Sequence, residues 1–285
     1  MICYSGRIAI YSFLFVVTSF TIIFLPSRIF SALSQVPGCV IFGPIVYFLC
    51  INIILKLIYN GEPYQIAVRA ALLGFIFSLG IFIKIHSESG LQVFGVYMCV
   101  MAIFHYTEFL SIAIIQPNLV STDSFVINHS KEYTIAALTS WTEYFLEYYF
   151  FSSMKTIHWL SNIGLIICVG GELLRKSAMF TAKSNFNHIV QCHKNPDHVL
   201  VTHGVYGLCR HPSYVGWFYW SVGTQIILLN PLCTLAYAYV SWIFFRDRIN
   251  IEELTLLNFF GEEYYNYQKK VGSGLPLIEG YKLEA

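Results

Sequence analysis

Polar side chains able to do chemistry concentrate in two short stretches late in an otherwise apolar chain. The first, residues 201–217, reads V-T-H-G-V-Y-G-L-C-R-H-P-S-Y-V-G-W and carries two His, one Arg and two Tyr. The second, residues 246–253, holds two Arg, one Asp and two Glu. Guanidinium groups and carboxylates form strong charge-assisted hydrogen bonds with ions of opposite sign. In an apolar chain, the two stretches therefore predict a site for a polar small molecule.

A helical hairpin is expected to bring the two stretches together. Apolar segments at 215–229 and 232–245 separate them, and Asn230-Pro231 joins these segments. Because Asn-Pro favours a turn, the chain should return to the side that it left.

Arg248 and Glu252 are four residues apart and therefore share one helix face. Two interpretations stay open for this pair. It is either a salt bridge that anchors a helix end or part of a functional site. Its clustering with Arg246 and Glu253, opposite the His-rich loop, favours the functional site.

Composition places the chain among membrane proteins. It is 56% hydrophobic and 12% charged, with a mean hydropathy of +0.60. Apolar helices of about 17–25 residues can span a bilayer. An all-α polytopic membrane protein is predicted, with about eight transmembrane helices near residues 8–25, 37–58, 65–85, 91–115, 132–151, 156–174, 213–229 and 232–245. The net charge of +1 argues against nucleic-acid binding.

We expect one integral-membrane domain over residues 1–285. Its predicted parts are transmembrane helices 1–6 (1–180), a cytosolic segment (181–212), the helical hairpin (213–249), and a C-terminal interfacial helix with a tail (250–285). Apolar residues recur at helical spacing from Ile251 to Val271, as in a helix lying on a membrane surface. With this topology, 14 of the 17 Lys and Arg share one side with both termini, which makes that side cytosolic.

Histidine is enriched before the hairpin, where five of the nine fall in residues 188–211. The first four are five residues apart, which scatters them around a helix, and no C-x-x-C or H-x₃-H accompanies them. No metal site is predicted. His211-Pro212 is instead expected to shape the backbone, because proline biases the preceding residue toward an extended conformation.

Four ionisable residues lie within the fourth and fifth predicted spans: His105, Glu108, Glu143 and Glu147. Such groups are costly at membrane depth and usually pair or line a cavity. The sequence leaves open whether they join helices or form a wall for a polar substrate group.

Several motifs together resemble the isoprenylcysteine carboxyl methyltransferase family, whose members methylate the C-terminal prenylcysteine of processed CaaX proteins. The matching runs are N-H-S-x-E-Y-T (128–134), G-E-x-L-R-K (171–176), N-F-N-H-I-V-Q (185–191), H-G-V-Y-G-L-C-R-H-P-S-Y-V-G-W (203–217), F-F-R-D-R-x-x-x-E-E (244–253) and F-F-G-E-E-Y (259–264). The hairpin motif and the R-x-x-x-E-E group also occur in phospholipid N-methyltransferases and membrane sterol reductases. The upstream motifs narrow the resemblance to the one family.

The resemblance implies S-adenosylmethionine as cofactor, bound at the cytosolic face by residues 181–212 and the hairpin. Its implied contacts are Gln191, His198, Val199, Leu200, Val201, Tyr206, His211, Pro212, Ser213, Tyr214 and Glu252. Arg248 is implied to bind the substrate carboxylate and to act with Glu252 and Arg246 in catalysis, while Arg246 and Glu253 have supporting roles. Implied partners are prenylated CaaX proteins, farnesylated or geranylgeranylated, and membrane lipid. The implied location is the endoplasmic reticulum membrane, with the active site facing the cytosol.

The chemistry agrees with this assignment. A C-terminal carboxylate has an unperturbed pKa of about 3.3–3.7 and is already anionic at neutral pH. Methyl transfer from a sulfonium then needs alignment and removal of water rather than a general base. The alternatives are a phospholipid N-methyltransferase, an NADPH-dependent sterol reductase with the related hairpin, and a non-enzymatic transporter. Binding of S-adenosylhomocysteine rather than NADPH would discriminate among them.

Overall fold

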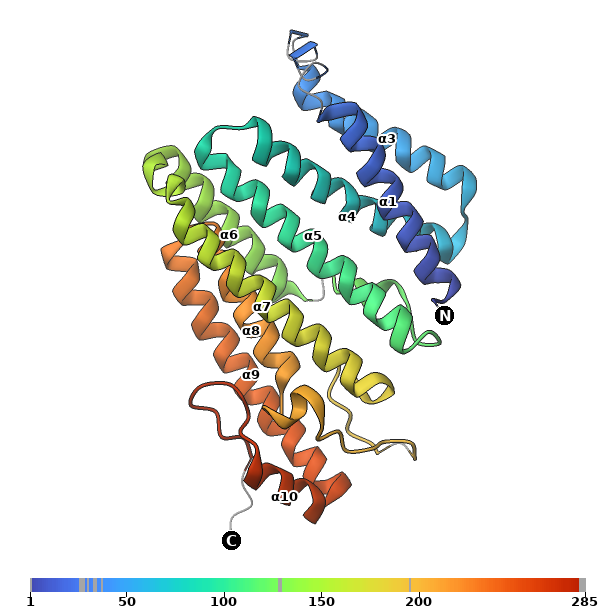
Figure 1. Ribbon diagram of the computed structural model, residues 1–285, viewed down its shortest axis with the longest axis vertical. Helices are drawn as coiled ribbons and strands as arrows, with labels where there is room; N and C mark the ends of the chain where they lie inside the picture. Colours follow the sequence, from blue (N-terminus) through green and yellow to red (C-terminus); the bar gives the residue numbers. More distant parts are fainter. Residues whose placement is uncertain are drawn as a thin grey trace. The chain divides into compact units, whose positions relative to one another are not determined.

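The computed structural model describes residues 2–25, 29, 31–32, 35–36, 38–127, 130–194 and 196–281 (Figure 1). Pro37, Asn128 and His129, which belong to predicted segments or motifs, lie outside the described residues, as does the chain after residue 281. The helices are α1 (Tyr4–Phe24), α3 (Cys39–Ile58), α4 (Gly61–His86), α5 (Ser89–Ile115), α6 (Lys131–Phe150), α7 (His158–Ala182), α8 (Pro212–Ile227), α9 (Pro231–Phe260) and α10 (Glu262–Lys270), with the short 3-10 helices η1 (Thr122–Phe125), η2 (Ser152–Thr156), η3 (Lys183–Asn185) and η4 (Gly204–Gly207).

Each of the eight segments predicted to span the membrane contains an α-helix, and the all-helical fold is confirmed. By length and composition, α1, α4 and α5 can cross a bilayer, with mean hydropathies of 1.9, 2.3 and 1.8. The apolar part of α3 (Phe42–Ile58) is shorter. The chain divides into two compact units, Met1–Ser161 with Ile227–Leu229, and Asn162–Ile226 with Asn230–Ala285.

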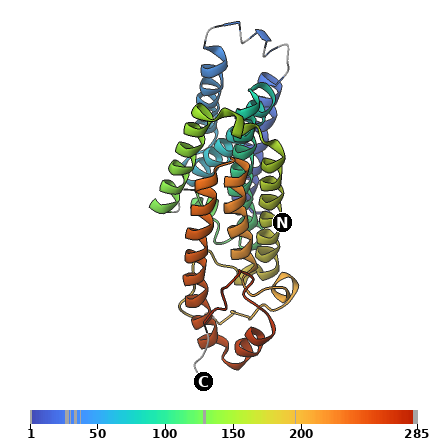
Figure 2. The same ribbon diagram turned by 90° about the vertical axis from the view of Figure 1, so that its left-hand side faces the viewer.

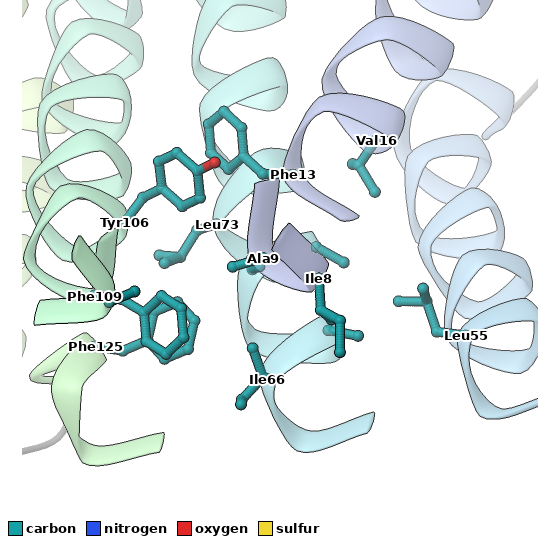
Figure 3. Close-up of a cluster of buried hydrophobic side chains, with 14 of the residues drawn as sticks. Ile8, Ala9, Phe13, Val16, Leu55, Ile66, Leu73, Tyr106, Phe109 and Phe125 are labelled. Carbon is teal, nitrogen blue, oxygen red and sulfur yellow. The ribbon is translucent and has the colours of Figure 1, made fainter. Parts of the chain in front are cut away.

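Helices α1, α3, α4 and α5, together with η1, build the core of the first unit (Figure 3). Phe13 of α1 stacks on Tyr106 of α5, with ring centroids 3.9 Å apart. Phe109 of α5 stacks on Phe125 of η1 at 4.1 Å. A Cβ at Gly80 of α4 would lie 2.6 Å from a backbone oxygen of α5, so glycine allows these two helices to approach closely.

His105, one of the ionisable residues within the predicted spans, joins neighbouring elements of this unit. It is buried, and its Nδ1 lies 3.0 Å from the carbonyl oxygen of Phe125. Its Nε2 lies 2.9 Å from the hydroxyl of Tyr133 on α6. A neutral imidazole has one donor and one acceptor nitrogen, so Nδ1–H donates to the carbonyl and Tyr133 donates to Nε2. For His105, the geometry favours the helix-joining interpretation.

Glu147 likewise has a structural partner. The ammonium group of Lys155 in η2 is fully buried and lies 2.7 Å from the Glu147 carboxylate. It also donates to the carbonyl oxygens of Leu228 (2.9 Å) and Leu229 (3.0 Å). A buried charge is tolerated when it is paired and hydrogen-bonded. The three acceptors therefore explain how a lysine is accommodated here.

In the second unit, α7 and α8 cross at glycines. A Cβ at Gly171 of α7 would lie 2.5 Å from the carbonyl oxygen of Gly216 on α8, and a Cβ at Gly216 would lie equally close to that of Gly171. Farther along, a Cβ at Gly223 would lie 2.8 Å from Sγ of Cys168. Small residues allow helix backbones to pack this closely. The crossing brings Arg175, one turn beyond Gly171, against the first turns of α8.

The hairpin turns at Asn230-Pro231, as predicted. Asn230 is fully buried, and its N–H donates to the carbonyl of Gln225 at 3.1 Å. Its side-chain amide also donates to the Gln225 side chain at 3.3 Å. Pro231 begins α9, where a proline removes no helix hydrogen bond. Figures 1 and 2 show α8 and α9 side by side.

The second arm of the hairpin is longer than expected. We predicted a hairpin ending at residue 249, followed by a separate amphipathic helix, but α9 continues without a break to Phe260. Residues 246–250 contain neither Pro nor Gly, so nothing in their backbone chemistry ends the helix. Gly261, with φ of +53°, ends it instead. The second polar stretch, residues 246–253, therefore lies in the C-terminal half of α9. The helix that follows, α10, is only nine residues long.

Beyond α10, residues 271–281 fold back as a C-terminal strap. Leu275 and Ile278 of the strap are buried in a cluster with Cys209 and with Phe245 and Ile249 of α9. Packing of apolar side chains thus holds the strap against the two stretches that carry the polar motifs.

Candidate active site

A cavity of about 60 Å³ lies between the loop that precedes α8, the first turn of α8, and α9. Its lining residues are Asn185, Phe186, Asn187, Tyr206, Arg210, His211, Pro212, Ser213, Tyr214 and Glu252. Pro212 is the first residue of α8, where its fixed φ suits the start of a helix. His211 and Pro212 both line the cavity, and His211 also contributes its side chain, while the backbone-shaping role of the pair stays a prediction.

Tyr214 joins the two polar motifs. Its hydroxyl donates to the Glu252 carboxylate and accepts a hydrogen bond from Nε of Arg248 at 2.9 Å. A second guanidinium nitrogen of Arg248 donates to the carbonyl of His188. Arg248 and Glu252 do share one face of α9, as their spacing predicts, but the phenol stands between them. Each is held toward the pocket wall through Tyr214 rather than as a simple surface pair.

Glu253 is the centre of a buried network. Its carboxylate oxygen Oε1 accepts from Nε of Arg210 at 2.8 Å and from Nε2 of His211 at 2.9 Å. Its Oε2 accepts from the side-chain amide of Gln268 at 2.9 Å. Burial raises the pKa of Glu253, but the hydrogen bonds and charges of His211 and Arg210 outweigh it and hold the pKa below its usual value. Glu253 is therefore a carboxylate in the folded chain.

The pocket wall stays uncharged at Tyr206. Burial, together with the nearby charge of Glu252, raises the pKa of the Tyr206 phenol. At neutral pH its hydroxyl is protonated and able to donate a hydrogen bond.

Six of the predicted cofactor contacts line the cavity: Tyr206, His211, Pro212, Ser213, Tyr214 and Glu252. The other five, Gln191, His198, Val199, Leu200 and Val201, belong to the adjoining loop and do not line it. This loop is tied to the pocket because the N–H of Val199 donates to the side chain of Asn185 at 2.9 Å. In the described part of the chain, the buried Nδ1 of His198 has no hydrogen-bond partner.

Arg246, predicted to act with Arg248, lies apart from the cavity lining. Its side chain is 44% exposed and pairs with Asp247 at 2.7 Å. Two residues along a helix place side chains on different faces. Arg248 does not line the cavity either, but it bonds the wall of the cavity at the Tyr214 hydroxyl.

Sequence reasoning assigned no role to several residues that the structure places at the site. Asn185, Phe186 and Asn187 belong to a recognised motif but were given no contacts, although they line the cavity. Arg175 is fully buried and donates to the hydroxyl of Ser213 at 2.6 Å. Its guanidinium also lies 4.5 Å from the ring of Trp217. The available signal was the place of Arg175 in the matched motif G-E-x-L-R-K (171–176).

The grouping of His, Cys, Asp and Glu side chains decides whether the chain could bind a metal ion. Among the described residues, no three His, Cys, Asp or Glu side chains gather closely enough to hold a metal ion.

Comparison with known proteins agrees with the geometry. Residues 164–258 match the Isoprenylcysteine carboxyl methyltransferase (ICMT) family. A protein-S-isoprenylcysteine O-methyltransferase of Tribolium castaneum is 56% identical over 285 residues, which cover 99% of this chain and 100% of the relative. The Homo sapiens enzyme of that name is 53% identical over 85% of each chain. A solved structure of the eukaryotic intramembrane Ras methyltransferase ICMT is 55% identical, with a TM-score of 0.94, and covers 98% of this chain and 100% of that one.

The apolar helices and the polar pocket, with this structural likeness, define an all-helical, multi-pass intramembrane enzyme. The chain is 56% identical to the Tribolium castaneum enzyme over 99% of its length, and it therefore belongs to the isoprenylcysteine carboxyl methyltransferase family. It is thus a methyltransferase that uses S-adenosylmethionine, as the resemblance in its motifs implied. This family membership excludes the three alternatives: a sterol reductase, a phospholipid N-methyltransferase and a transporter.

Proposed function

We propose that the pocket behind Tyr214 holds S-adenosylmethionine and that Arg248 binds the carboxylate to be methylated. The substrate would be the C-terminal isoprenylcysteine of a processed CaaX protein, farnesylated or geranylgeranylated, with its prenyl chain in membrane lipid. The observation that carries the proposal is the Tyr214 hydroxyl, which bonds both Arg248 and Glu252. These bonds support the proposal because they join Arg248, the proposed carboxylate-binding group, to the wall of the proposed cofactor pocket.

The pocket residues suit the cofactor. Glu252 offers a carboxylate that is 29% exposed, which can receive an ammonium group or a hydroxyl. Phe186 and Tyr206 offer aromatic surface, and Asn185 and Asn187 offer amides. The cavity is smaller than the roughly 300 Å³ or more that encloses most drug-sized ligands. We infer that the rest of the cofactor lies along the adjoining loop, on Gln191 and residues 198–201.

The residues of the site align and desolvate the reacting groups. When bound, S-adenosylmethionine would supply a methyl group on its sulfonium, and transfer of that methyl group to a carboxylate oxygen would leave the sulfur as a neutral thioether. Arg248 presents a planar fork of N–H donors, and its bonds to Tyr214 and His188 restrict how that fork can turn. Because the carboxylate is already anionic, no side chain has to remove a proton. Arg246, exposed and paired with Asp247, keeps only a supporting, electrostatic role.

The site is proposed to face the cytosol, and the protein to reside in the endoplasmic reticulum membrane. The excess of Lys and Arg on the side of both polar stretches supports the orientation. From that side, the cofactor would enter from water while the prenyl chain approaches through lipid.

The substitution Arg248→Lys tests the assignment. Lysine keeps the charge but loses the rigid fork, so the acceptor carboxylate should be misaligned while the cofactor pocket is preserved. A misplacement of about 1 Å can lower the rate about 100-fold. We expect a loss of that order in methyl transfer to farnesylcysteine, with the dissociation constant for S-adenosylhomocysteine nearly unchanged.

Arg69→Lys provides the matched control, since the Arg69 guanidinium bonds Gln65 on its own helix. Its activity should equal that of the unmodified enzyme. Activity of Arg248→Lys within about threefold of wild type would contradict the proposed role. Loss of both activity and cofactor binding would identify a structural arginine instead.

A further inference from the structure

We propose that Glu253 is a positioning residue for the cofactor pocket and that the C-terminal strap determines where Glu253 holds His211. No family motif that we matched extends into the strap, and the strap does not line the cavity. The inference rests on the proposed function, because it takes the pocket to be the cofactor site.

The orientation of His211 follows from its bond to Glu253. Nε2 of His211 lies 2.9 Å from Oε1 of Glu253, which also accepts from Arg210. A carboxylate can only accept, so Nε2 carries a proton. The opposite ring nitrogen, Nδ1, then points toward the pocket, 4.0 Å from Glu252. The imidazole is thereby presented to a ligand in one fixed orientation.

The C-terminal strap holds the residues that hold His211. Arg210 donates to the carbonyls of Val271 and of Glu279 (2.7 Å), at the two ends of the strap. The backbone N–H of His211 donates to the carbonyl of Ser273 at 3.2 Å. Gln268, which bonds Glu253, also donates to the carbonyl of Tyr281 at 2.6 Å. Arg210 and Gln268, which both donate to Glu253, are thus themselves fixed by the strap.

Gly280 is where the strap backbone meets Glu253 directly. A Cβ at Gly280 would lie 1.8 Å from Oε2 of Glu253, much closer than any atoms can approach without a shift. Gly280 also has φ of +84°, which disfavours any other residue. Glycine is therefore required for the strap to close on this carboxylate. A methyl group there would displace Glu253 without adding anything to the pocket.

Gly280→Ala is the main test, with two glycine controls. Gly272→Ala places a methyl group elsewhere on the strap, where nothing lies within 4 Å. Gly261→Ala imposes a similar positive φ (+53°) in open space. All three are compared by the dissociation constant for S-adenosylhomocysteine, by kcat at saturating S-adenosylmethionine, and by melting temperature without ligand.

We expect Gly280→Ala to raise the dissociation constant about tenfold or more, the size of one lost hydrogen bond to a charged group. Saturating cofactor should restore kcat to within about threefold, because the carboxylate-binding Arg248 is untouched. The two controls should bind as the wild type does. A purely structural strap would instead lower the melting temperature while leaving the affinity unchanged, and that result would overturn the inference.

Gln268→Met supplies an independent variant should Gly280→Ala fail to fold. It removes one donor to Glu253 and leaves the pocket lining intact, so the dissociation constant should rise at least about threefold. An unchanged dissociation constant in this variant would also overturn the inference. Glu252→Gln separates the two proposals. If Glu252→Gln weakens binding while Gly280→Ala and Gln268→Met do not, the pocket assignment stands and the positioning role fails. If Glu252→Gln has no effect either, the pocket assignment itself fails.

Discussion

Tyr214 shows how a single hydroxyl can organise a charged site. A direct ion pair between Arg248 and Glu252 would use up the groups that a ligand needs. With the phenol between them, each keeps hydrogen-bonding capacity for a ligand of opposite charge. The Tyr214 ring stacks on the rings of His211 and Phe245, with ring centroids 5.6 and 5.3 Å apart, and these contacts limit its movement.

Glu252→Gln is expected to weaken cofactor binding with little effect on folding. The amide keeps the shape of the side chain but removes the negative charge offered to the cofactor. Since the carboxylate is 29% exposed, we expect about 1.5–3 kcal/mol, or about 10–100-fold in the S-adenosylhomocysteine dissociation constant. Titration calorimetry on the purified enzyme measures it. Glu262→Gln, on the exposed first turn of α10, serves as control. Wild-type affinity in Glu252→Gln would contradict the proposed role and favour the interpretation of Arg248 and Glu252 as a pair that anchors a helix end.

The buried network around Glu253 should make folding sensitive to acid. Its pKa in the folded chain lies below the unfolded value of about 4.3, so its contribution is complete above that pH and declines as pH falls toward the folded value. Melting temperatures measured between about pH 6 and 3 should fall more steeply for the wild type than for Glu253→Gln, which has no proton to take up. Parallel curves for the two proteins would show that Glu253 does not titrate with unfolding.

The residues that sequence reasoning missed share a physical cause. The partners of Glu253 lie 43, 42 and 15 residues away in the chain, at Arg210, His211 and Gln268. No local periodicity reports such contacts. Arg175 was hidden similarly, because its partner Ser213 is 38 residues away. Spacing within one helix, by contrast, correctly predicted that Arg248 and Glu252 share a face.

At the scale of elements, the crossing of α7 and α8 determines where the pocket wall begins. Because Gly171 and Gly216 leave no room for side chains, the two helices are held at backbone contact. That contact places Arg175 against Ser213, and Ser213 lines the cavity. Helix packing thus fixes the start of α8.

Gly171→Ala should therefore destabilise the protein, whereas Gly170→Ala should not. The methyl group at 171 would lie 2.5 Å from the carbonyl of Gly216, while at 170 nothing lies within 4 Å. Overpacking of this kind costs about 1–3 kcal/mol. The neighbouring change should be neutral or slightly stabilising, because alanine favours helix by up to about 1 kcal/mol over glycine. Melting temperatures of the two variants in detergent provide the comparison. Equal values would show that the crossing is not tightly packed.

Helix boundaries were predictable where local chemistry marks them and not elsewhere. Asn230-Pro231 announced the turn of the hairpin, and α9 begins at Pro231. The end of α9 was missed because polarity changes near residue 246 while the helix continues. A change in polarity tells where lipid gives way to water, not where a helix stops. Gly261 was the backbone signal for the end.

At the scale of the whole molecule, orientation is the property that charge predicts. Both termini and residues 175–212 should be cytosolic. A glycosylation sequon inserted between α4 and α5, after Ser87, should be modified in microsomes, because that turn is expected on the opposite side. The native sequon at Asn128 and a sequon fused after residue 285 should stay unmodified. Glycosylation at either of these two sites, or its absence at the site after Ser87, would contradict the predicted topology.

The C-terminal strap has a consequence for how the enzyme is made. Translation completes Tyr206 and His211 early, Glu252 and Glu253 later, and residues 271–281 after all of these. Until the strap leaves the ribosome, Arg210 lacks its carbonyl partners at Val271 and Glu279. A nascent chain whose helices are already inserted in the membrane thus lacks the strap contacts that fix Arg210 beside the pocket. Nonsense mutations as late as residue 270 would therefore produce inserted helices without a working enzyme.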